Sequence, residues 1–127
     1  MKGLPEISAA EWDVMKVVWD HGPATSGEIV KHLEAERKWR PRTIKTLLAR
    51  LVKKGAVLSR EDPVGRFLYS AKVQRDAVVR RESRSFVRRV FDGAVAPALV
   101  HFLEDAELTP AQIDELKKIL KRRESAK

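Results

Sequence analysis

The sequence predicts a mainly α-helical protein with one small β-hairpin, organised as a compact domain at residues 1–72 and a helical region at residues 73–127. Three observations support this fold class. Helix-start signals recur along the chain, apolar residues repeat at helical spacing, and turn residues between two short strand-like segments occur at residues 56–70. The 127 residues suffice for one small domain of about 70 residues with a helical extension that has no core of its own.

The first two predicted helices begin at capping boxes. In a capping box a hydroxyl accepts a hydrogen bond from the amide three residues further on, and the side chain at that position bonds back. Ser8 and Glu11 form one such pair, and Thr25 and Glu28 form another. The apolar residues of the first helix share one face, which predicts a buried side: Trp12, Met15, Val18 and Trp19.

A third helix and a hairpin complete the N-terminal domain. Pro41 suits the first position of the helix, and Gly55 ends it. Residues 56–61 and 66–70 are predicted strands around a turn at residues 62–65. Three helices followed by a hairpin are typical of a winged helix-turn-helix. The third helix has a single apolar stripe, predicted to be buried: Ile44, Leu47, Leu48, Leu51 and Val52.

Beyond residue 72 the signals are helical only. A helix near residues 74–91 ends at Asp92-Gly93, a short helix follows, and Thr109 caps a last one. One-sided apolar stripes on such helices need a partner, and a symmetry-related copy of the same chain supplies one, which predicts a homodimer. The predicted dimerisation residues are Phe86, Val90, Leu99, Phe102, Leu103, Ile113, Leu116, Ile119 and Leu120.

Positive charge is concentrated in one part of the chain. The sequence has 26 basic and 18 acidic residues, a net charge of +8, and it has no acidic residue between Arg37 and Arg60. Charge this dense predicts a surface that faces a polyanion, although a solvated basic face is the alternative. The basic residues of this stretch are Arg37, Lys38, Arg40, Arg42, Lys45, Arg50, Lys53, Lys54 and Arg60.

The third predicted helix carries much of this charge opposite its apolar stripe. The major groove of double-stranded DNA admits one α-helix, whose N-terminal residues approach the bases. Arg42 suits guanine, whereas Thr43 and Thr46 suit a thymine methyl group or a phosphate. Basic residues further along the helix and at the hairpin tip suit phosphates or the minor groove. The predicted DNA-binding residues are Arg42, Thr43, Lys45, Thr46, Arg50, Lys53, Lys54, Arg60 and Arg66.

A second basic stripe lies on the first helix of the tail. Arg80, Arg84 and Arg88 recur every four residues and therefore share one face. Two interpretations remain open. The stripe either contacts flanking DNA or pairs across the dimer with acidic residues, and pairing is favoured because interface arginines are often ion-paired. Candidate partners are Glu104, Asp105 and Glu107.

The sequence gives little support for an enzyme, a metal-binding protein or a membrane protein. The sequence has no cysteine, which excludes disulfides and thiolate metal sites. His21, His32 and His101 have neither metal-ligand spacing nor a nucleophile nearby, so we expect no enzyme, no metal and no cofactor. The N-terminus lacks a signal pattern, and the longest apolar stretch, residues 94–100, is too short to span a bilayer. We therefore expect a cytoplasmic protein without a membrane partner.

The sequence resembles the BlaI/MecI-type penicillinase repressors, and the resemblance extends over nearly the whole chain. The matching stretches are residues 7–15 (ISAAEWDVM) with Trp19, residues 43–51 (TIKTLLARL), residues 53–55 (KKG) and residues 102–103 (FL). The resemblance implies a winged-helix transcriptional repressor that binds a palindromic operator as a homodimer, without a cofactor, in antibiotic resistance.

The resemblance also implies a mechanism of release. In the family, a membrane sensor's signal leads to cleavage of the repressor in its dimerisation region by a sensor-linked protease. The best-known members are cut at an Asn-Phe bond, which aligns with His101-Phe102, and His101 departs from that pattern. Two alternatives stay open: a ligand-sensing winged-helix regulator with a pocket between the DNA-binding domain and the dimer helices, or a winged-helix protein-interaction module. The acid-free third helix argues against the latter.

Overall fold

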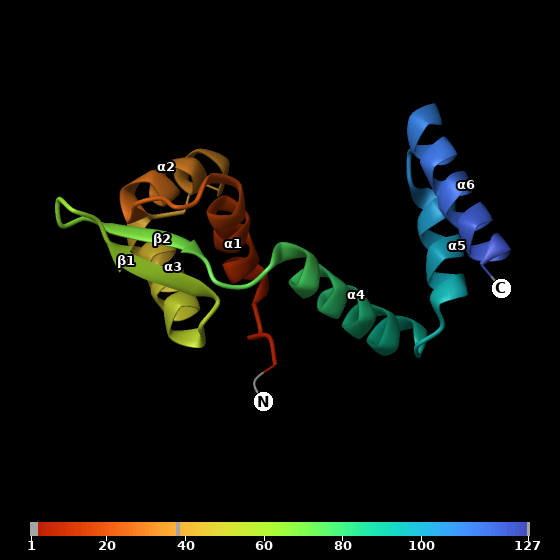
Figure 1. Cartoon of the computed structure of the whole chain (residues 1–127), viewed down its shortest axis with the longest axis horizontal. Coiled ribbons are helices and arrows are strands. Elements are labelled where there is room, and N and C mark those ends of the chain that lie inside the picture. Colours follow the sequence, from red (N-terminus) through yellow and green to blue (C-terminus); the bar gives the residue numbers. More distant parts are fainter. Residues whose placement is uncertain (1–2, 38, 127) are drawn as a thin grey trace. The chain divides into compact units, whose positions relative to one another are not determined.

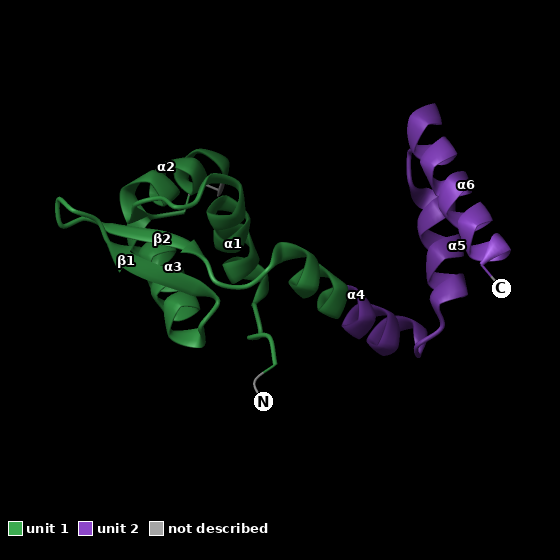
Figure 2. Ribbon diagram, viewed as in Figure 1, with its two compact units in different colours: residues 1–82 green, residues 83–127 purple. Residues whose placement is uncertain are grey.

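The computed structural model describes residues 3–37 and 39–126, except for the side chain of Arg37, and it contains six helices and two strands within them (Figure 1). Lys38, counted in the basic stretch, lies outside the described residues. The chain divides into two compact units, residues 1–82 and residues 83–127 (Figure 2). The mostly helical content and the antiparallel hairpin confirm the predicted fold class.

Helices α1 (Ala9–His21) and α2 (Ser26–Arg37) begin where their capping boxes predict. At α1, the Ser8 amide donates to Glu11 Oε1 at 2.9 Å, and the Glu11 amide donates to Ser8 Oγ at 3.2 Å. At α2, the Thr25 amide donates to Glu28 Oε1 at 2.8 Å, and the Glu28 amide donates to Thr25 Oγ1 at 3.2 Å. Both boxes are therefore formed, and each satisfies helix-terminal amides that would otherwise lack a partner.

Helix α3 (Pro41–Lys54) packs its apolar stripe into the core of the N-terminal unit. Ile44, Leu47, Leu48 and Leu51 are buried as predicted, and Val52 lies half-buried at the edge. Gly55 ends the helix in the left-handed region with φ 85°, a conformation that side chains with a Cβ rarely adopt. The core residues of the other helices that meet this stripe include Met15, Val18, Ile29 and Leu33.

The hairpin consists of β1 (Val57–Glu61) and β2 (Phe67–Ala71), paired antiparallel from Val57 opposite Ala71 to Glu61 opposite Phe67. Both strands lie within one residue of the predicted positions. Ala24, in the turn before α2, adds a short bridge to the hairpin: its amide donates to Tyr69 O at 3.0 Å, and its carbonyl accepts from the Tyr69 amide at 2.8 Å. The hairpin is thus fixed to the helix-turn-helix by backbone hydrogen bonds.

The second unit holds the end of α4 (Arg75–Phe91) together with α5 (Val95–Asp105) and α6 (Pro110–Ser125). The predicted capping box at α6 is formed, with the Thr109 amide 2.9 Å from Gln112 Oε1 and the Gln112 amide 3.1 Å from Thr109 Oγ1. Ala98 is the one buried side chain among the described residues of this unit. None of the helices described here has the length and apolarity needed to span a membrane.

Candidate nucleic-acid interface

Helix α3 presents a continuous polar and basic face opposite its buried stripe. The face starts at Arg42 in the first turn and ends at Lys53 in the last, and the first turn contains no acidic residue. Positive side chains on one exposed helix face create an electrostatic surface that attracts a polyanion. The residues of this face, which we call the basic face of α3, are all exposed: Arg42, Thr43, Lys45, Thr46, Ala49, Arg50 and Lys53.

The hydroxyl proton of Thr46 is used in a hydrogen bond within α3. Its hydroxyl donates to the carbonyl of Arg42 one turn earlier, at 2.9 Å. The hydroxyl oxygen still has a free lone pair, and the side chain still carries a methyl group. Thr46 can therefore offer an acceptor or an apolar contact to a ligand on the basic face without losing its bond to the helix.

Lys54 is adjacent to Lys53 but lies in different surroundings. Its ammonium group donates to Glu11 Oε1 at 2.6 Å and to the carbonyl of Glu6 at 2.9 Å. The Glu11 side chain is only 2% exposed, and the Lys54 side chain is 35% exposed. Lys54, which the sequence predicts as a phosphate contact, is thus bonded to Glu11 of α1 and to the N-terminal segment.

Pairing with Lys54 favours the ionised form of the Glu11 carboxyl. Burial alone raises the pKa of Glu11, but hydrogen bonds from Lys54 and from the amide and hydroxyl of Ser8, together with the charge of Lys54, outweigh burial and lower the pKa below its ordinary value. A buried carboxylate therefore joins the N-terminus of α1 to the C-terminal end of α3. Sequence reasoning missed the ion pair because the two residues are far apart along the chain.

The two wing arginines lie in different settings. Arg60 is exposed on β1. Arg66 bonds Asp62 across the hairpin turn, with Arg66 Nε 2.9 Å from Asp62 Oδ2. The pKa of the Asp62 carboxyl is lowered mainly by a hydrogen bond from the Arg66 amide, which is 2.8 Å from Oδ1. The tip of the wing therefore keeps a fixed shape, with the Arg66 side chain still largely exposed.

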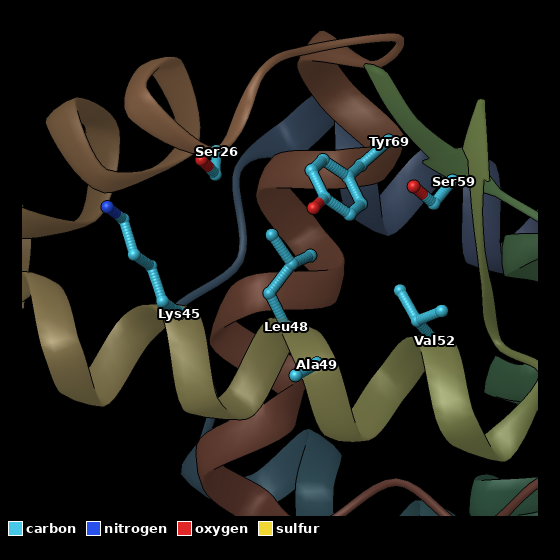
Figure 3. Close-up of a pocket in the computed structure, with 7 residues that line it drawn as sticks. All are labelled: Ser26, Lys45, Leu48, Ala49, Val52, Ser59 and Tyr69. Carbon is cyan, nitrogen blue, oxygen red and sulfur yellow. The ribbon is translucent and has the colours of Figure 1, made fainter. Parts of the chain in front are cut away.

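A pocket of about 310 Å³ opens beside the basic face of α3, between this helix, the start of α2 and the hairpin. Figure 3 shows the side chains from α3 along one side, with Ser26 of α2 and the hairpin residues Ser59 and Tyr69 facing them. Sequence reasoning did not assign these three residues, although the capping box at Thr25 already places Ser26 in the first turn of α2. The side chains from α3 are Lys45, Leu48, Ala49 and Val52.

The predicted dimerisation residues lie on the helices of the second unit. Phe86 and Leu116 are half-buried there, and the other seven are exposed: Val90, Leu99, Phe102, Leu103, Ile113, Ile119 and Leu120. An open groove of about 630 Å³ runs beside α5, with Val87, Leu99 and Phe102 among the residues that line it. His101 and Phe102, which flank the predicted cleavage bond, lie inside α5 rather than in a loop.

The histidines do not form a metal site among the residues that the structure describes, where no group of three or more His, Asp and Glu side chains is suited to hold an ion. His21 and His32 instead stack their rings, with centroids 3.8 Å apart. His101 Nε2 lies 3.7 Å from Asp105 Oδ2 one turn further along α5. The sequence pattern did not predict the stack of His21 on His32.

A helix with a basic outer face, held by a helix-turn-helix and flanked by a β-hairpin wing, defines a winged-helix DNA-binding protein. The model of the penicillinase repressor family matches residues 7–122. The chain therefore belongs to the penicillinase repressor family, a family of DNA-binding transcriptional repressors rather than enzymes, as the sequence resemblance implied.

Individual relatives agree with this membership. The penicillinase repressor of Bacillus licheniformis is 37% identical over 128 residues, which cover 100% of this chain and 98% of the relative. The methicillin resistance regulatory protein MecI of Staphylococcus aureus strain N315 is 32% identical over 118 residues, or 93% of this chain and 95% of MecI.

Two solved structures resemble the N-terminal part of the chain. One is the DNA-binding domain of the repressor BlaI, with 39% identity and a TM-score of 0.53 over 61% of this chain and 93% of that chain. The other is the monomeric form of Bacillus licheniformis BlaI in complex with the blaP half-operator, with the same identity, TM-score and coverage.

Proposed function

We propose that this repressor binds a palindromic DNA operator as a homodimer, with the basic face of α3 in the major groove of each half-site. The observation that carries the proposal is this face itself, which combines four exposed basic residues with two threonines and has no acidic residue. The related repressor BlaI, which is 39% identical over 61% of this chain, has been solved in complex with a half-operator, which supports the same use of the fold here.

The residues of the basic face divide by their place along α3. Arg42 and Thr43 lie in the first turn, where a helix in the major groove approaches base edges, so they are assigned to base recognition together with Thr46. Arg50 and Lys53 lie towards the C-terminal end and are assigned to phosphates, which set the register of the complex without reading its sequence.

The wing and the pocket extend the contact to the DNA backbone. Arg60 and the exposed part of Arg66 suit phosphates or the minor groove next to the half-site. In the pocket, the hydroxyls of Ser26 and Tyr69 and the ammonium of Lys45 offer several hydrogen-bond donors around one opening. Such donors suit a phosphate of the strand that borders the major groove.

The dimer is assigned to the second unit. Within that unit only Ala98 is buried among the described residues, whereas nine large apolar side chains of α4, α5 and α6 are exposed. Exposed apolar side chains in this number often mark an interaction surface, and a twofold-symmetric contact with a second copy would cover them. Arg84 and Arg88 line the groove beside α5, where they are available for pairing with acidic residues of the partner subunit.

Release of the DNA is assigned to cleavage at or near the His101-Phe102 bond by a sensor-linked protease. Phe102 packs with Phe86 and Phe91, at centroid distances of 6.0 Å and 6.1 Å, and is still 45% exposed. Cleavage would remove this ring from the dimer face together with all of α6. Because the names of relatives refer to penicillinase and methicillin resistance, we propose resistance genes as the targets, regulated in the cytoplasm.

Binding measurements on selected DNA test the proposal. We expect the full chain to select an inverted repeat from random duplex DNA, with half-site centres about one helical turn or a multiple apart. The slope of log K on log salt should be about −0.9 for each neutralised phosphate, and Lys53→Ala should reduce its magnitude by about one with the same base preference. Binding that does not depend on salt would contradict DNA binding altogether.

Arg42→Ala is the matched test of base recognition. This variant should lose preference at one base pair in each half-site, at a cost of about 1–3 kcal/mol for the lost bidentate contact. Lys53→Ala removes the same charge from the other end of the basic face and serves as its control. If Arg42→Ala weakens binding to all sequences equally, Arg42 contacts phosphate and the assignment is wrong.

A further inference from the structure

The N-terminal segment crosses the first unit between two cationic side chains that belong to different helices. Arg81 of α4 donates to the carbonyl of Leu4 and, at 2.7 Å, to the carbonyl of Pro5. Lys54 at the end of α3 donates to the carbonyl of Glu6 at 2.9 Å. We call this arrangement, residues 4–6 with Arg81 and Lys54, the N-terminal clasp.

The clasp is anchored in the core and is not a loose surface contact. Ile7, the residue after the clasp carbonyls, is 7% exposed and belongs to the hydrophobic core. Lys54 also pairs with the buried carboxylate of Glu11 at 2.6 Å. Hydrogen bonds from charged donors are stronger than those between neutral groups, so the three carbonyls are held firmly from both sides.

A second set of contacts fixes the start of α4 from the side of α1. Trp19 Nε1 donates to the carbonyl of Val73 at 3.1 Å. The guanidinium of Arg75 bonds Asp20 at 2.9 Å and lies 5.6 Å from the centre of the Trp19 ring. Val78, one turn further along, is completely buried in the core of the winged helix. The first two turns of α4 are therefore part of the DNA-binding unit.

From this geometry we infer that the N-terminal clasp determines which half-site spacing the repressor accepts, with Arg81 as the positioning residue. Helix α4 continues without a break from Arg75 to Phe91 and contains no glycine or proline, so fixing its first turns fixes the direction in which it leaves the winged helix. The inference rests on the proposed dimer on a palindromic operator. In that dimer, α4 itself carries two of the predicted dimer residues, Phe86 and Val90, and a fixed direction of this helix leaves little tolerance for changed spacing.

The test uses the full chain and two neighbouring arginines. Arg81→Met removes the clasp donor, whereas Arg80→Met removes an equal charge from an exposed residue that pairs with Asp76 on its own helix. Each protein is titrated against duplexes that carry two selected half-sites with spacing varied one base pair at a time, and against a duplex with a single half-site. The wild type should prefer its best spacing over adjacent ones by about tenfold or more.

We expect Arg81→Met to reduce that preference several-fold while affinity for the single half-site stays within about twofold. Arg80→Met should keep the wild-type spacing preference, because Arg80 pairs with Asp76 on its own helix and any contact with flanking DNA would change the affinity at every spacing equally. Deletion of residues 1–5 removes the Leu4 and Pro5 carbonyls but keeps Arg81, and should have the same effect as Arg81→Met even if that variant folds poorly. A preference unchanged in both clasp variants, or an equal loss at every spacing and at the single half-site, would overturn the inference.

The outcome for the wild type separates this inference from the proposed function. If the wild-type protein selects no DNA sequence, the proposed function itself fails. If the wild type binds an inverted repeat as a dimer but tolerates all spacings equally, the operator proposal stands and the clasp has no positioning role.

Discussion

At the scale of single residues, charge on α3 serves two purposes. Lys53 is exposed on the basic face, whereas Lys54 neutralises the buried carboxylate of Glu11. Removing the partner of a buried charge leaves that charge without compensation, which destabilises a fold more than losing an exposed charge does. The two neighbouring lysines are therefore expected to affect different measurable properties, one stability and the other DNA affinity.

Lys54→Met should lower the free energy of unfolding by about 1–3 kcal/mol, because Glu11 loses its strongest hydrogen bond. The lower part of this range is expected, since Lys54 is 35% exposed and water can replace part of the interaction. Lys53→Met is the control and should change stability by less than about 0.5 kcal/mol. Urea unfolding of both variants measures the difference, and equal losses would contradict the assigned roles.

The lowered pKa of Glu11 predicts how this stability depends on pH. Because the folded pKa lies below the unfolded one, the paired carboxylate contributes stability at neutral pH, and this contribution is lost as pH falls through the folded pKa. The stability difference between wild type and Glu11→Gln should therefore shrink between about pH 7 and about pH 3. Glu34→Gln, which removes an equal charge from an exposed position of α2, is the control for loss of a carboxylate. A constant difference for Glu11→Gln would contradict the linkage.

At the scale of elements, the sequence predicts well what is encoded locally. The capping boxes at Ser8, Thr25 and Thr109 each involve residues three positions apart, and all three are formed. The buried stripe of α3 and the hairpin also follow from short-range patterns. The apolar stripe of α3 shows which side of the helix is buried. Because the helical period places the basic residues on the opposite side, the same pattern predicts an exposed basic face.

Contacts between distant residues could not be predicted in this way. The bridge between Ala24 and Tyr69, the ion pair of Lys54 and the bonds of Arg81 each join elements that are far apart in the sequence. Such pairings depend on the packing of whole elements and leave no periodic signal in a single sequence. For the same reason, the sequence did not predict that Ser59 and Tyr69 of the hairpin lie around one pocket with Lys45 of the basic face.

The packing of the turn before α2 gives a prediction at this scale. A Cβ added at Gly22 would lie 2.5 Å from the carbonyl oxygen of Val18 and 3.2 Å from that of Tyr69, so Gly22→Ala should push the wing away from α1 and lower stability by about 1–3 kcal/mol. At Gly27 the added Cβ would meet only Thr25 Oγ1, at 3.9 Å. Gly27→Ala should thus be neutral or stabilising by up to about 1 kcal/mol. Thermal unfolding distinguishes the two, and a tolerated Gly22→Ala would mean that the turn adapts.

At the scale of the whole molecule, the two units differ in how they obtain stability. The first unit has a core drawn from three helices, the hairpin and Val78 of α4. In the second unit Ala98 alone is buried among the described residues, and the apolar residues of α5 and α6 remain largely exposed. A unit of this kind gains most of its stability from a partner, so the folding of α5 and α6 should be coupled to dimerisation.

Under the proposed dimer, this coupling would be the reason why a cut in α5 releases DNA. A fragment that ends at His101 lacks Phe102, Leu103 and α6, but it keeps the complete core of the winged helix. The fragment should therefore be a folded monomer whose affinity for a single half-site equals that of the full chain. Its affinity for the palindromic operator should fall by about 10²-fold or more, because the second half-site is no longer held at high effective concentration.

Recombinant fragment 1–101 and the full chain, compared by sedimentation and by titration with half-site and palindromic duplexes, test this expectation. Phe102→Ala in the full chain is the matched variant, since it removes the ring next to Phe86 and Phe91 without a cut, and it should weaken the dimer by a smaller amount. Mass spectrometry of the repressor from induced cells then asks whether cleavage occurs near His101. A fragment 1–101 that remains dimeric with full operator affinity would place the dimer contact within residues 1–101. Intact repressor in fully induced cells would assign release to a ligand instead of a protease.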